Sequence, residues 1–78
     1  MDKAEALKKI TREVVGKRAG DGFYAKADAV LDEAGTSVAL MAAAKKIEGM
    51  VRLFVDEEFS GRLSEKYMDF FRSNPTYL

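Results

Sequence analysis

The side chains that could carry out chemistry in this 78-residue chain are carboxylates, lysines, serines and tyrosines, because the sequence contains no histidine and no cysteine. The commonest general base, the thiolate nucleophile and most transition-metal ligands are therefore missing together. Catalysis by the remaining groups needs two of them held in a cleft, and so small a domain fills most of its interior with core side chains. The sequence argues against an enzyme and predicts no cofactor.

Three carboxylates in the second expected helix form an acidic patch. Asp28, Asp32 and Glu33 lie at helical spacing on the side opposite to its apolar residues. A dinuclear metal site in a helical bundle would need further carboxylates, and usually histidine, facing inward from several helices. We therefore expect a solvated face and no metal site.

A glycine-containing stretch after the first expected helix superficially resembles a phosphate-binding loop. Such a loop needs Gly, four residues and then Gly-Lys-Ser/Thr between a strand and a helix. Here Gly16-Lys17 is followed by Arg18, and no strand is predicted before it. The stretch instead predicts the end of a helix, with Gly20 in the left-handed conformation and Gly22 opening the next helix.

Apolar periodicity and capping residues predict four helices. Their expected ranges are residues 3–19, 22–34, about 37–59, and 65 to a point before Asn74. The expected N-terminal caps are Asp2, Asp21, Thr36 or Ser37, and Ser64. Ser60-Gly61 predicts the break before the last helix, although one long bent helix is the alternative. The fold class is therefore all-α: one domain, residues 1–78, in which four helices pack around a long central helix.

The stretch 37–59 has the longest apolar periodicity and predicts the central helix. Ile47 and Phe54 lie on its apolar stripe, so both are predicted in the core. Other apolar residues lie off this stripe, which predicts a helix covered on two sides, either within one chain or in a homodimer. Gly49 in its middle is expected to permit close contact with another backbone.

Charge and hydropathy narrow the possible partners. Thirteen basic and thirteen acidic residues cancel, which argues against nucleic acid and anionic lipid. No apolar run approaches the roughly 18 residues of a membrane span, and no secretory signal is recognised, so we expect no membrane partner and a cytoplasmic location. A helix-turn-helix nucleic-acid-binding protein is the first alternative. A recognition helix exposes polar side chains near its start, whereas the helix in that place begins with the apolar residues Val38 and Leu40, which argues against this alternative.

The main functional prediction is a small, non-catalytic protein-protein interaction or regulatory module, whose partner is another protein or a second copy. A small carboxylate-based enzyme or metal-binding bundle is the second alternative. The candidate partner-binding residues are aromatic or apolar and lie near the C-terminus: Tyr67, Phe70, Phe71, Tyr77 and Leu78. The competing interpretation is that the first three pack on the central helix and only Tyr77 and Leu78 are available.

Overall fold

The computed structural model describes residues 2–74, and within that range it contains four α-helices, one 3-10 turn and no strand. The elements are α1 (Lys3–Val15), the 3-10 turn η1 (Gly16–Arg18), α2 (Asp21–Asp32), α3 (Ser37–Phe54) and α4 (Glu57–Ser73). The prediction of a small all-α domain with four packed helices is confirmed. The residues Tyr77 and Leu78 lie outside the described residues.

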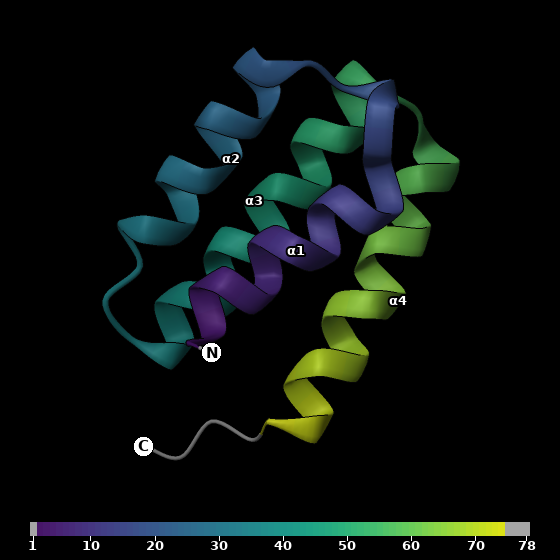
Figure 1. Ribbon diagram of the computed structural model, residues 1–78. Coiled ribbons are helices and arrows are strands. Elements are labelled where there is room, and N and C mark those ends of the chain that lie inside the picture. Colours follow the sequence, from purple (N-terminus) through teal and green to yellow (C-terminus); the bar gives the residue numbers. More distant parts are fainter. Residues whose placement is uncertain (1, 75–78) are drawn as a thin grey trace.

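The helices are arranged with α3 in contact with all three others. In Figure 1, α2 and α4 lie on opposite sides of α3, and α1 crosses in front of it. Within the described residues, α2 and α4 make no contact with each other, so α1 and α3 separate them. The central position predicted for the third helix is therefore correct.

Side-chain caps explain where α1, α3 and α4 begin, and the cap of α4 is described below with the boundary between α3 and α4. The carboxylate of Asp2 accepts a hydrogen bond from the amide of Glu5 at 2.9 Å, and the hydroxyl of Thr36 accepts one from the amide of Ala39 at 3.0 Å. The cap predicted at Asp21 is wrong. This residue is already the first helical residue of α2, and Gly20 before it supplies no side chain.

The first helix ends earlier than predicted. Gly16, not Gly20, takes the positive φ, at 58° and with ψ at −134°, and its amide donates to the carbonyl oxygen of Arg12. This backbone conformation is not helical, so the α-helix stops at Val15. Glycine suits the position because a residue with a Cβ is disfavoured in this conformation. The η1 turn then directs the chain toward α2, and the phenol of Tyr24 donates to the carbonyl oxygen of Gly16 at 2.6 Å.

The boundary between the last two helices is also displaced from the prediction. Asp56 begins α4 as its cap, accepting from the amide of Phe59 at 2.8 Å, so α3 ends at Phe54. The reason is electrostatic, because the carboxylates at 56–58 would oppose the dipole at the carbonyl end of α3 but stabilise the amino end of α4.

The predicted break at Ser60-Gly61 is therefore wrong, and so is the cap at Ser64. All three residues lie inside α4. The hydroxyl of Ser60 is buried and donates to the carbonyl oxygen of Glu48 at 2.9 Å, which ties α4 to α3. A residue that usually interrupts a helix here joins two helices.

The core is made of apolar side chains from all four helices. Its buried members are Leu7, Val15, Ala27, Leu31, Leu40, Ala43, Ala44, Ile47, Val51, Leu63 and Tyr67. Ile47 is completely buried, as predicted, whereas Phe54 is 72% exposed and the prediction for it is wrong. Gly49 is exposed and no atom lies within 4 Å of the position a Cβ would take, so the expected close contact is wrong as well.

Candidate docking surface

The aromatic residues predicted to bind a partner do not form one exposed patch. Tyr67 is 1% exposed and belongs to the core. Phe70 and Phe71 are half-buried against that core, with their rings edge to face at 5.4 Å. The packing alternative is therefore the one that the structure supports for these three residues.

The phenol of Tyr67 is held by a buried hydrogen bond to Thr11 in α1. The hydroxyl of Thr11 donates to the carbonyl oxygen of Leu7 at 2.7 Å, so its lone pair is available and the Tyr67 hydroxyl is the donor between the two. Burial raises the pKa of Tyr67 well above its ordinary value, against the smaller lowering effect of the hydrogen bond. This tyrosine therefore fixes α4 on α1 and is not available as a proton donor to a substrate.

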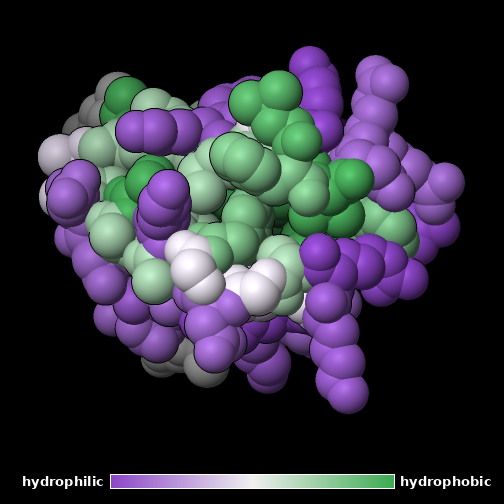
Figure 2. All heavy atoms as spheres, turned by 90° about the horizontal axis from the view of Figure 1, so that it is seen from above, coloured by the Kyte–Doolittle hydropathy of each residue, from purple (hydrophilic) through white to green (hydrophobic). Residues whose placement is uncertain are grey.

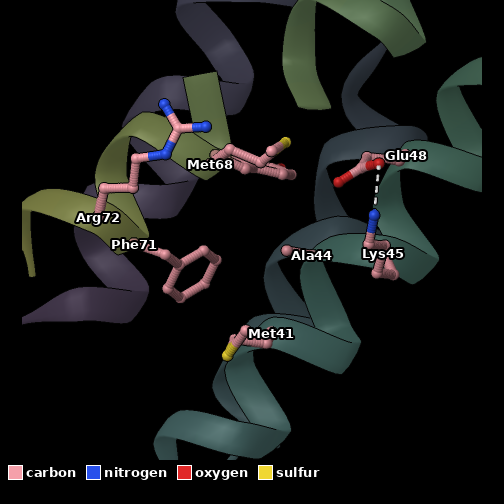
Figure 3. Close-up of a pocket in the computed structure, with 8 residues that line it drawn as sticks. Met41, Ala44, Lys45, Glu48, Met68, Phe71 and Arg72 are labelled. Carbon is pink, nitrogen blue, oxygen red and sulfur yellow. Dashed lines mark ion pairs between the residues drawn. The ribbon is translucent and has the colours of Figure 1, made fainter. Parts of the chain in front are cut away.

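A first surface hollow, of about 280 Å³, lies between α3 and α4 and is called the α3/α4 groove. Figure 3 shows the Phe71 ring projecting from α4 and Met41 lying across from it on α3. Met68 and Met41 are 47% and 44% exposed. The α3/α4 groove carries charges of both signs. On its α3 side, Lys45 and Glu48 approach each other to 3.9 Å.

Two of the three carboxylates in the predicted acidic patch, Asp28 and Asp32, are paired with cations from α1. The guanidinium of Arg12 donates to both carboxylate oxygens of Asp28 at 2.9 Å, and the ammonium of Lys8 lies 2.7 Å from a carboxylate oxygen of Asp32. Arg12 lowers the pKa of Asp28 through these hydrogen bonds. Among residues 2–74, no three potential ligands gather closely enough to hold a metal ion. These carboxylates join two helices.

Among the described residues, the two large apolar side chains with the highest exposure lie where α3 ends. Leu53 is 80% exposed and Phe54 is 72% exposed, although they are consecutive residues of a helix that is otherwise central. Figure 2 looks down on the end of the domain that is uppermost in Figure 1 and shows apolar side chains gathered there, with hydrophilic side chains around them. Contiguous exposed apolar area of this kind marks interaction sites more often than scattered apolar residues do.

Phe54 also lines a second and longer depression, which we call the α2/α3 groove. It consists of two neighbouring hollows of about 310 and 380 Å³, which share Lys26, Met50 and Phe54 as lining residues. Phe23 and Val30 add to the α2 wall. On α3, steps of four residues place Lys46, Met50 and Phe54 along one ridge, with Leu53 three residues after Met50.

The α2/α3 groove is apolar at its base and mostly basic at its edges. Its charged lining residues are Arg18, Lys26, Lys46 and Glu33. Arg18 stacks over the ring of Phe59 at 4.1 Å and is thereby held beside the groove. Gly20 and Gly22 line the same end, where α2 begins without a side-chain cap and its first amides add positive potential.

Sequence reasoning missed this surface because it placed Phe54 in the core. The signal was present in the apolar run Leu53-Phe54-Val55, which directly precedes three carboxylates. If the helix ends within this run, its last residues lie at the edge of the domain, where fewer neighbouring side chains can cover them.

Comparisons with family models, with curated proteins and with solved structures found no match to this chain. No helix formed by the described residues combines the length and the apolar character needed to cross a lipid bilayer.

Proposed function

We propose that this protein is a small, non-catalytic interaction module that binds another protein through the α2/α3 groove and the adjoining Leu53 side chain. The observation that carries the proposal is the exposure of Leu53 and Phe54, at 80% and 72%, beside two neighbouring apolar hollows. A few side chains that become buried and well packed at the centre of a protein interface, aromatic ones prominent among them, supply most of its binding energy.

The location of the polar groups supports binding without catalysis. Tyr67 and Thr11 are satisfied by each other inside the core, and Asp28 and Asp32 are held by cations of α1. The groove itself offers cations and apolar surface, which suit recognition of a protein segment.

The α2/α3 groove is a better candidate than the α3/α4 groove for two reasons. Its neighbouring side chains Leu53 and Phe54 are more exposed than Met41 and Met68 are. It is also longer, because its lining residues on α2 run from Gly22 to Val30, whereas those of the α3/α4 groove on α4 run from Tyr67 to Arg72.

A second copy of the chain is a poorer occupant than another protein. A two-fold dimer would bring the same groove of each copy face to face. The mostly basic edges of both grooves would then share one interface, and an excess of like charge across an interface disfavours binding.

Site-specific photo-crosslinking tests the proposal in cells that naturally make the protein. A benzophenone amino acid at Leu53 is expected to crosslink a distinct protein, which is then identified and purified. A benzophenone at Glu65 is the control, since that residue is exposed on α4, away from the groove. In a purified system, Phe54→Lys should raise the Kd at least about tenfold, whereas Glu65→Lys should leave it unchanged.

Three results would contradict the proposal. They are the absence of a crosslinked protein at Leu53, the same products at Leu53 and Glu65, and a partner whose affinity is unaffected by Phe54→Lys. A crosslinked dimer of the chain as the sole product would replace the proposal with self-association.

A further inference from the structure

The shape of the α2/α3 groove suits a helix from the partner. Both walls are helices, and the groove extends along α2, whose 12 residues span about 18 Å. An occupant of roughly three helical turns matches this length. The described residues contain no strand, so they offer no sheet edge to which an extended peptide could add.

The apolar base of the groove sets the spacing of the anchors on such a helix. Phe23, Met50 and Phe54 line the hollow near the start of α2, and Val30 lines the hollow farther along α2. A helix lying in a groove of this kind inserts residues at positions i, i+3 or i+4, and i+7. Methionine adapts its shape to different anchors, so Met50 favours tolerance of anchor identity.

The charges at the edges set the polar residues of the occupant. Lys26 lines both hollows and Lys46 lines the second, and neither forms an ion pair with another residue in the range 2–74. Arg18 adds a third cation near the start of α2, while Glu33 is the one acidic residue among the lining residues described. Carboxylates that border the apolar stripe of a bound helix would lie beside these cations.

From this combination we infer that the α2/α3 groove binds an amphipathic helix whose apolar stripe is bordered by aspartate or glutamate. The inference rests on the proposed function and adds the chemical class of the bound segment. Electrostatic attraction accelerates the encounter and selects the acidic helix, while burial on Phe54 and Met50 keeps it bound.

A display library of 14-residue helical peptides tests the inference with the full chain. Three anchor positions at i, i+4 and i+7 vary among large apolar residues, and four bordering positions each carry Glu, Gln or Lys in equal proportion. Selection against the intact protein is expected to enrich Glu over Lys by about tenfold or more at the bordering positions. Raising the ionic strength should reduce this preference.

Matched variants show whether the preference comes from this groove. Lys26→Glu combined with Lys46→Glu should reverse the preference from Glu to Lys, and Phe54→Lys should abolish enrichment. Circular dichroism verifies that each variant folds, which is expected because all three side chains are exposed. Enrichment of Gln or Lys by the intact protein, a preference for Glu that survives charge reversal, or no enrichment at all would overturn the inference.

The proposed function and this inference can fail separately. A partner that crosslinks at Leu53 but contacts the groove through a loop, a strand or a basic helix would leave the function standing and overturn the inference. A chain that neither selects peptides nor crosslinks a protein would overturn both.

Discussion

Tyr67 of α4 donates its phenolic proton to the hydroxyl of Thr11 in α1, across 56 residues of sequence and inside the core. Both side chains are 1% exposed. The hydroxyl of Thr11 in turn donates to the carbonyl oxygen of Leu7. Both buried hydroxyls are satisfied by these bonds, and no other buried side-chain nitrogen or oxygen among the described residues lacks a partner.

The direction of these hydrogen bonds predicts that substitutions of Tyr67 and Thr11 reduce stability by different amounts. Tyr67→Phe should lower the free energy of unfolding by about 0.5 to 1.5 kcal/mol, because Thr11 keeps its bond to Leu7. Thr11→Val should cost about 1 to 3 kcal/mol, because the phenol is left buried without an acceptor. The double variant should be more stable than the sum of the two losses predicts. Urea unfolding of all four proteins measures these values, and equal or reversed single effects would contradict the assigned direction.

Two apolar residues of α3 that look equivalent in sequence should respond differently to truncation. Ile47→Ala should cost about 2 to 5 kcal/mol, since it removes a completely buried side chain and leaves a cavity. Phe54→Ala should change stability by less than about 0.5 kcal/mol, since its side chain is largely in solvent. Thermal unfolding compares the two, and a large loss for Phe54→Ala would mean that its ring is part of the core.

The different positions of Ile47 and Phe54 show what could be predicted from sequence. Periodicity identified the helices and the buried stripe because those signals are local. The end of α3 depended on whether the carboxylates at 56–58 belonged to the helix before or after them, and only the sign of the helix dipole decided that. Ser60 was misread because the group that satisfies its hydroxyl, the carbonyl of Glu48, comes from another helix. The α2/α3 groove was missed for the same reason, because the misplaced end of α3 put Phe54 in the core.

Removing the cap of α4 should distinguish the true start of this helix from the predicted one. Asp56→Ala is expected to lower stability by about 0.5 to 2 kcal/mol, since it leaves the amide of Phe59 without its acceptor. Ser64→Ala should have an effect below about 0.5 kcal/mol, because this residue lies in the middle of the helix. Chemical denaturation followed by circular dichroism compares the variants, and a larger loss at Ser64 would restore the sequence-based boundary.

The ion pair between Arg12 and Asp28 predicts a pH-dependent part of the stability. Arg12 lowers the pKa of Asp28, so the folded state is favoured above the ordinary aspartate pKa of about 3.9, and this contribution is lost as the pH falls through the lower folded pKa. Asp28→Asn should cost at most about 1 kcal/mol at pH 7, because the pair is partly solvated.

Unfolding measured from pH 7 to pH 2 tests this expectation. The difference between the intact chain and Asp28→Asn should be constant above about pH 5 and should close as the carboxylate is protonated below about pH 4. Glu65→Gln is the control, because Glu65 is exposed and forms no ion pair with a described residue. A difference that is independent of pH would exclude the ion pair as its cause.

Replacement of Gly16 and of Gly49 by alanine should change the stability of the fold in opposite directions. Gly16→Ala should destabilise the fold by about 1 to 3 kcal/mol, since its φ of 58° is unfavourable for a residue with a Cβ. Gly49→Ala should stabilise it by about 0.5 to 1 kcal/mol, because the site is helical, exposed and free of neighbours within 4 Å. Melting temperatures of the two variants test the pair, and destabilisation by Gly49→Ala would reveal a hidden contact there.

The contacts that α4 makes with α1 and α3 give this helix a closing role in the fold. Leu63 and Tyr67 of α4 are buried against the other helices, so the faces of α1 and α3 that they cover would be open to water in a fragment that stops at Phe54. Such a fragment would present to chaperones and proteases apolar surface that the intact fold hides. The docking of α4 is therefore the step that turns an adhesive intermediate into an inert one.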